Sequence, residues 1–240
     1  MSYREYLHKV MGLIEQLEQK SCEPIEQAAR LLGETVLADG LIYAFGSGHS
    51  QCLAREVAGR AGGLFTIQGI ADPLKGRGER VEGLAEELLK AYPLKSGETM
   101  IVISNSGRNA MPIEMALGAQ QRGLKVIAVT SLKHSSASES RHSSGKRLFE
   151  IADVVLDTGG PLGDAVIELG DTGLKIGAVS TVLGAALLNA TVVAAIEYVS
   201  ARGKTPPILV SFNVDGSDEH NARVIEQYGS RMPDCWGIQA

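Results

Sequence analysis

Two short segments rich in serine and glycine each follow an apolar run. The first, Gly46-Ser-Gly-His-Ser50, comes after Leu41–Phe45, and the second, Ser104-Asn-Ser-Gly-Arg-Asn109, comes after Met100–Ile103. Glycine lets the backbone approach a ligand closely, and serine hydroxyls are short, rotatable donors. Each segment also precedes a helical pattern, and the N-terminus of a helix favours an anion. The segments therefore predict a phosphate-binding site formed by Gly46, Ser47, Gly48, Ser50, Ser104, Asn105, Ser106, Gly107, Arg108 and Asn109.

Two other interpretations of these segments stay open, a dinucleotide site and ordinary tight turns. Gly46-x-Gly48-x-x-Gln51 lacks the third glycine of the dinucleotide motif G-x-G-x-x-G, although Asp72 lies at about the distance expected of a ribose-binding acid. No G-x-x-x-x-G-K-[ST] sequence is present, which argues against P-loop nucleotide binding. Because two loops share one design, we favour anion binding over simple turns.

Alternating strand and helix patterns would position both loops. After two N-terminal helices, short apolar runs alternate with helical stretches, which predicts a doubly wound, mostly parallel five-stranded α/β sheet with helices on both faces. The expected strands are 41–45, 64–70, 100–103, 125–130 and 154–156. The expected helices are 3–20, one from Pro24, 51–61, 79–91, 110–122, 180–200 and 219–228. In such a sheet, loops at the carboxyl ends of strands line the ligand crevice.

Three segments lack a regular pattern. Residues 131–147 are rich in serine and predict a long polar loop, either a lid or a mobile connection. Residues 157–173 are rich in glycine and aspartate and predict a surface loop, and residues 206–216 predict an extended segment. No change in composition demands a second domain. We therefore expect one domain over 1–240, with N-terminal helices at 1–38, a core at 39–200 and a C-terminal extension at 201–240.

Composition excludes several classes of protein. The chain has 240 residues, a formal net charge of −5 and 44% hydrophobic residues, so general nucleic-acid binding and disorder are disfavoured. Cys22, Cys52 and Cys235 form neither a disulfide framework nor a CxxC pair, and the N-terminal residues hold no signal-like apolar core. Residues 181–199 contain Asn189 and many small residues, so we expect a buried or interface helix there. These features predict a cytoplasmic protein that binds no nucleic acid and no membrane.

The two loops resemble those of the SIS (sugar isomerase) domain. Gly46-Ser-Gly-His-Ser50 is similar to the first phosphosugar loop of that superfamily, and Ser104-Asn-Ser-Gly-Arg-Asn109 is similar to its S-x-S-G-x-T loop. One residue departs from the pattern, since Asn109 stands in place of threonine. The resemblance implies a flavodoxin-like sheet, a sugar-phosphate ligand and a dimer with sites near its interface. We predict a homodimer that uses the small-residue-rich helix 180–200.

Two glutamates are candidates for a carbon base. Glu56, in Arg55-Glu-Val-Ala-Gly-Arg60, resembles the catalytic glutamate of phosphoheptose isomerases, and Glu82, in Arg80-Val-Glu-Gly83, resembles one in N-acetylmuramic acid 6-phosphate etherases, as does Ser106-Gly-Arg108. Either glutamate is also interpretable as an ordinary helix charge. The resemblance implies a phosphosugar isomerase first. An etherase-like lyase or dehydratase, or a sugar-phosphate sensor without catalysis, are the alternatives.

Histidines are natural candidates for a second acid or base. His49 lies inside the first loop, and His220 begins a C-terminal helix that could reach a neighbouring site. His134 and His142 fall in the serine-rich segment, in a repeated His-Ser-Ser. No spacing of acids and histidines matches a standard zinc or calcium motif, so we predict no metal and no cofactor.

Overall fold

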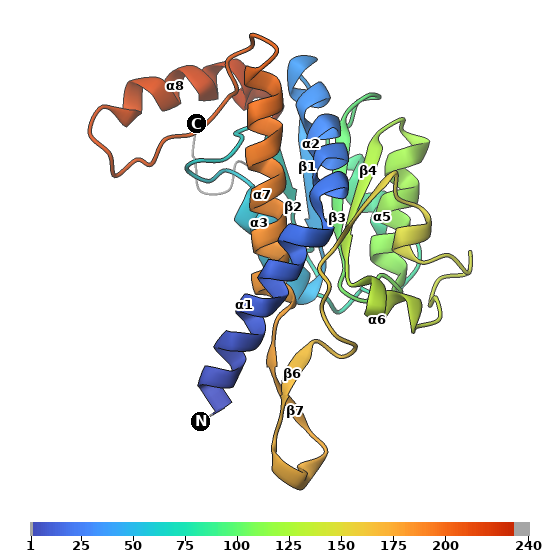
Figure 1. Cartoon of the computed structure of the whole chain (residues 1–240). Coiled ribbons are helices and arrows are strands. Elements are labelled where there is room, and N and C mark those ends of the chain that lie inside the picture. The colour runs from blue at the N-terminus through green and yellow to red at the C-terminus, as the bar shows by residue number, and fades with distance from the viewer. Residues whose placement is uncertain (1, 233–240) are drawn as a thin grey trace.

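A five-stranded parallel sheet forms the centre of the computed structural model, which describes residues 2–232 (Figure 1). Neighbouring strands pair in the order β2-β1-β3-β4-β5, all parallel. This is the flavodoxin-like order, in which the direction of strand addition reverses between β1 and β3. The predicted doubly wound α/β fold is confirmed. The strands are β1 (Ile42–Gly46), β2 (Ile67–Ile70), β3 (Thr99–Ile103), β4 (Lys125–Thr130) and β5 (Val154–Asp157).

Side chains alternate between two hydrophobic layers along each strand. Ile42 and Ala44 of β1 face a layer that includes α2, α3 and α7, whereas Tyr43 and Phe45 face a layer that includes α4 and α5. A strand buried on both faces is apolar throughout, which explains the continuous apolar runs in the sequence. The two layers lie on opposite sides of the sheet (Figure 1). These helices are α2 (Cys22–Leu37), α3 (Gln51–Val57), α4 (Leu84–Lys90), α5 (Ala110–Gln121) and α7 (Ser180–Ser200).

Helix α7 is the one helix among residues 2–232 that is long and apolar enough to cross a membrane. It packs along α2 and α3 instead, with Leu183, Leu187 and Val199 buried in the core. Its small residues admit neighbouring side chains, since a Cβ atom on Gly184 would lie 2.5 Å from Cδ1 of Leu53. The apolar residues of α7 therefore pack in the hydrophobic core of this fold.

The N-terminal helix and a hairpin extend from the body of the molecule (Figure 1). Helix α1 (Ser2–Lys20) contacts a hairpin formed by β6 (Ala165–Glu168) and β7 (Lys175–Ala178). The Tyr6 hydroxyl donates to the Ala178 carbonyl at 2.8 Å. The surface loop predicted over 157–173 is therefore wrong in part, because residues 165–168 form a strand of this hairpin. Strands of four residues between glycines are too short to produce a clear alternating pattern.

Other differences from the predicted elements are local. Helix α6 (Leu132–Ser136) opens the segment that was expected to be a loop, and α8 (Ser217–Tyr228) lies near the C-terminus. Helix α4 begins at Leu84 rather than at 79, because Gly83 has a left-handed backbone (φ 90°) that interrupts the helix. Helix α3 ends at Val57 rather than at 61. Cys22 and Cys52 are free thiols, and Cys235 lies outside the described residues.

Candidate functional site

A cavity of about 570 Å³ opens at the carboxyl ends of β1 and β3. The residues that follow β1 line one part of it, and Ser104, Asn105 and Ser106, which follow β3, line another. The order of strands reverses between β1 and β3, and open α/β sheets bind ligands at this position. The fold therefore brings the two predicted loops together. Ser47, Gly48, His49, Ser50 and Asn109 also line the cavity.

The loop after β3 is held in a tight turn. Ser104 Oγ accepts a hydrogen bond from the Gly107 N–H at 3.2 Å, and Gly107 has a left-handed backbone (φ 58°). A Cβ atom at Gly107 would lie 2.7 Å from Ser135 Oγ, so a larger residue does not fit. Asn109 begins the twelve-residue helix α5 and is buried. Arg141 Nη1 donates to Asn109 Oδ1 at 3.0 Å. This bond engages the side-chain oxygen of Asn109 and leaves its NH₂ group as a donor for another partner.

Three predicted phosphate-binding residues do not line the cavity. Gly46 and Gly107 shape the turns, since a Cβ atom at Gly46 would lie 2.4 Å from the Ser50 carbonyl oxygen. Arg108 is turned away, and its Nε donates to the Glu139 carbonyl at 2.8 Å. Phosphate binding by these three residues stays a prediction, because their side chains or Cα atoms face the protein rather than the cavity.

The segment after β2 contributes two cations that the sequence analysis missed. Lys75 and Arg77 line the cavity and are exposed, and neither forms an ion pair within the described part of the chain. Asp72 starts this segment but does not line the cavity, and it accepts from Ser47 Oγ at 2.7 Å. Both Asp72 oxygens are engaged within the protein, which removes the support for a ribose-binding acid. Because β2 pairs with β1 in parallel, the loop after β2 lies at the same edge of the sheet as the loop after β1. This pairing, rather than any residue pattern, identifies the loop after β2 as a third part of the site.

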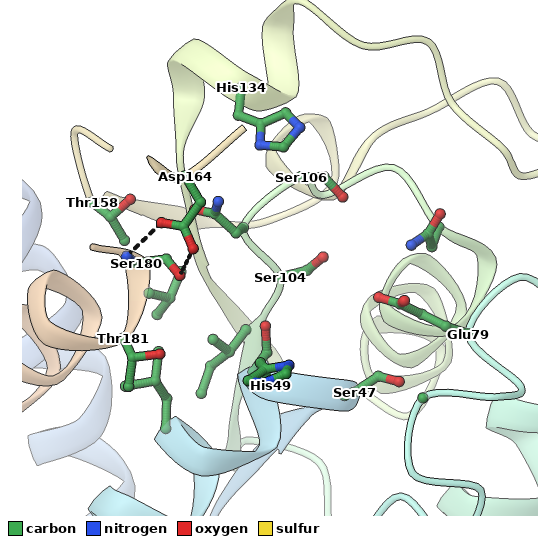
Figure 2. Close-up of a pocket in the computed structure, with 18 of the residues that line it drawn as sticks. Ser47, His49, Glu79, Ser104, Ser106, His134, Thr158, Asp164, Ser180 and Thr181 are labelled. Carbon is green, nitrogen blue, oxygen red and sulfur yellow. Dashed lines mark hydrogen bonds between the residues drawn. The ribbon is translucent and has the colours of Figure 1, made fainter. Parts of the chain in front are cut away.

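Two carboxylates line the cavity, and they differ in their surroundings (Figure 2). Asp164 accepts from the Val179 and Ser180 N–H groups at 3.0 and 2.7 Å and from Ser180 Oγ at 2.8 Å, so it caps the N-terminus of α7. The Glu79 carboxylate accepts no hydrogen bond from any residue in 2–232 and lies near Ser47 in Figure 2. Glu79 is therefore the carboxylate that is available to a ligand.

Two histidines line the cavity on opposite sides in Figure 2. His49 is exposed. His134 comes from α6, and its Nδ1 is buried without a hydrogen-bond partner in the described structure. Burial lowers the pKa of His134. The negative charge of Asp164 opposes this shift, and the smaller effect of Arg108 adds to it. His220 does not line the cavity, since its Nε2 lies 2.9 Å from the Ile208 carbonyl oxygen.

The two glutamates predicted as the carbon base lie outside the cavity of the single chain. Glu56 forms an ion pair with Arg60 and accepts a hydrogen bond from Asn189 Nδ2 at 3.4 Å. Glu82 accepts from both the N–H and Oγ of Ser143 at 2.7 Å, and these bonds lower the pKa of Glu82. Their catalytic roles stay predictions.

One group of side chains in the described structure has the geometry of a metal site. Ligand atoms of Glu82, Glu114 and His142 lie within 4.8 Å of one another. Both carboxylates already accept hydrogen bonds, since the Gly83 N–H donates to the two Glu114 oxygens at 2.7 and 2.9 Å. The group joins the 138–147 segment to α5, outside the cavity.

Comparisons with known proteins agree with this architecture. A model of the SIS domain matches residues 5–131. A UPF0309 protein of Halalkalibacterium halodurans is 39% identical over 236 residues, which cover 95% of this chain and 98% of the relative.

Three solved structures share the fold. A putative phosphosugar isomerase from Bacteroides fragilis has a TM-score of 0.59 and 18% identity, covering 91% of this chain and 95% of that one. The phosphoheptose isomerase of Neisseria gonorrhoeae has a TM-score of 0.53 and 19% identity, covering 83% and 96%. The Vibrio vulnificus NanR protein, complexed with ManNAc-6P, has a TM-score of 0.53 and 14% identity, covering 98% and 71%. The matched domain and the relative that covers 95% of this chain show that the chain belongs to the SIS-domain family and to its UPF0309 proteins.

Proposed function

We propose that this protein is a phosphosugar isomerase. The observation that carries the proposal is the cavity, which combines two hydroxyl-rich loops with the unpaired cations Lys75 and Arg77 and the free carboxylate Glu79. Hydroxyls, cations and a helix N-terminus suit a phosphate group, whereas a carboxylate suits proton transfer. Membership of the SIS family and the fold shared with phosphosugar isomerases support a sugar-phosphate ligand.

The residues divide into a phosphate end and a reacting end. Ser50, Ser104, Ser106 and the Asn109 amide donate to the phosphate, at the start of α5. Glu79 removes the proton from the carbon next to the carbonyl and returns it to the former carbonyl carbon. The proton of the adjacent hydroxyl passes to the former carbonyl oxygen, and the two transfers together interconvert aldose and ketose. The lowered pKa of His134 favours its neutral form. Neutral His134 takes the proton of the anomeric hydroxyl as the ring C–O bond breaks and passes it to the ring oxygen.

A coupled assay over hexose, heptose, pentose and amino-sugar phosphates tests the activity. We expect turnover by the wild type and a loss of about 10²-fold or more in kcat for Glu79→Gln, the typical contribution of a general base. Glu87→Gln is the matched control, because Glu87 pairs with Lys90 on the exposed side of α4. No turnover of any substrate by the wild type would contradict the proposal.

The same assay decides between the carboxylates. Glu56→Gln and Glu82→Gln are tested beside Glu79→Gln, and a selective loss in either would assign the base to that residue instead. Ketose formation separates isomerisation from etherase-like elimination, which gives an unsaturated product and no ketose. Binding of sugar phosphates without any turnover would instead favour a sensor, for which the shared fold of NanR is the supporting observation.

We also propose that the protein is a cytoplasmic homodimer. The exposed side chains of Tyr3, Leu7, Met11 and Ile14 lie at helical spacing on α1 and support an interface with a second copy. The free thiols of Cys22 and Cys52 suit a reducing compartment. A single domain over 1–240 stays a prediction.

A further inference from the structure

The hydroxyl of Ser47 differs from those of Ser50, Ser104 and Ser106, the serines assigned to the phosphate, because its proton is already used in a hydrogen bond. Ser47 Oγ donates to Asp72 Oδ2 at 2.7 Å in a buried position. A carboxylate accepts hydrogen bonds and has no proton to give, so the single proton of the hydroxyl must lie on this bond. Only the lone pairs of Ser47 Oγ remain for a ligand in the cavity.

Asp72 is held so that this direction cannot easily reverse. Its side chain is buried, with 2% exposure. The Leu74 N–H donates to Oδ1 at 2.9 Å, and the Gly76 N–H donates to Oδ2 at 2.7 Å. Three donors therefore converge on one carboxylate, and each requires Asp72 to act as an acceptor.

We propose that Ser47 and Asp72 form a subsite that accepts a hydrogen bond from a sugar hydroxyl and does not bind the phosphate. A phosphate oxygen needs a donor, and Ser47 has none to offer, while the buried Asp72 charge behind it repels a second anion. This proposal differs from the prediction from sequence that the Ser47 side chain holds the phosphate. The inference rests on the proposed function, in which the ligand is a sugar phosphate.

The sheet places this subsite beside the phosphate end of the cavity. Gly46 of β1 pairs with Ile103 of β3, so Ser47 and Ser104 follow equivalent positions on adjacent strands. Adjacent strands lie about 5 Å apart, which is close to the width of one sugar ring. A sugar whose phosphate contacts the loop after β3 thus directs a ring hydroxyl toward the loop after β1.

Asp72 also ties the cation-bearing segment to the first loop. Its Oδ2 accepts from both Ser47 and Gly76, so one atom connects the two walls of the cavity. The contact is close, since a Cβ atom at Gly76 would lie 3.1 Å from Gly48 Cα. Asp72 is therefore a positioning residue that orients the Ser47 hydroxyl and holds the segment with Lys75 and Arg77.

Binding measurements with two probes test this subsite. Inorganic phosphate and the tightest-binding sugar phosphate of the assay panel are titrated by calorimetry into the wild type, Ser47→Ala and Ser47→Thr. We expect Ser47→Ala to weaken the sugar phosphate roughly tenfold, the size of one hydrogen bond, and to leave phosphate affinity within about twofold. Ser47→Thr keeps the hydroxyl and should restore the wild-type ratio. The matched control Ser50→Ala should weaken both probes.

Asp72→Asn tests the direction of the hydrogen bond. An asparagine NH₂ in the place of Oδ2 can donate to Ser47 Oγ, which frees the hydroxyl proton to point into the cavity, although the hydrogen bond from the Gly76 N–H is then lost. We expect weaker sugar-phosphate binding with equal or tighter phosphate binding. Equal weakening of both probes by Ser47→Ala would overturn the subsite and leave the proposed function intact, even if Asp72→Asn fails to fold. Phosphate binding without binding of any sugar phosphate by the wild type would overturn both.

Discussion

His134 makes the stability of this protein depend on pH. Burial lowers its pKa below 6.5, so the unfolded chain binds this proton at a higher pH than the folded chain does. Stability contributed by neutral His134 is therefore complete above about pH 6.5 and declines as the pH falls toward the folded pKa. In urea unfolding from pH 7.5 to 5.5, we expect His134→Asn to lose less stability than the wild type. The difference in slope stays below roughly 1.4 kcal/mol per pH unit, the limit for one proton.

His220→Asn is the control for this measurement, because its ring lies outside the cavity. Identical slopes for the wild type and His134→Asn would show that burial of the ring does not oppose its protonation.

At the scale of elements, Glu82 joins the 138–147 segment to the residues before α4. The N–H and Oγ of Ser143 both donate to Glu82, and these bonds lower the pKa of Glu82. We expect Glu82→Ala to raise hydrogen exchange of amides in 138–147 by roughly tenfold, since two hydrogen bonds to a charge are lost. In the wild type the attachment is complete above pH 4.5 and is lost as the pH falls through the lowered pKa.

Exchange in α5 is the internal reference, and Glu87→Ala is the control variant, because that exposed side chain pairs with Lys90 on the same helix. Unchanged exchange in 138–147 of Glu82→Ala would mean that other contacts, such as the bond from Arg141 to Asn109, hold the segment.

At the scale of the whole molecule, the exposed face of α1 favours self-association. Leu7 and Met11 are 54% and 53% exposed and lie one turn apart. We expect the wild type to be a dimer by light scattering, and Leu7→Glu combined with Met11→Glu to be a monomer, because two charges would be buried at the interface. Val193→Glu alters the exposed side of α7, the helix that the sequence analysis assigned to the interface. A monomer only in Val193→Glu would support that earlier assignment, and a monomeric wild type would contradict both.

The sequence alone determined the sheet and the position of the two loops within it. Continuous apolar runs such as 125–130 predict strands buried on both faces, and that strand was confirmed at both ends. Serine and glycine after two such strands then identify loops at one edge of the sheet, because parallel strands share their carboxyl ends. Both the apolar runs and the serine and glycine segments that follow them are local patterns of consecutive residues.

Only the tertiary structure decided which side chains meet in the cavity and which of them are already engaged in ion pairs or hydrogen bonds. Lys75, Glu79 and Asp164 have no periodic signal, and strand order and a chain reversal bring them to the same edge. The predicted Glu56 matches a sequence pattern, yet its carboxylate pairs with Arg60 on the same helix. From sequence, Ser47 resembles the other serines of the two loops, but in the fold its hydroxyl donates a hydrogen bond to Asp72, 25 residues away. Hydrogen-bond direction depends on the partner in space, so residue type identified the donor and the fold decided what it can bind.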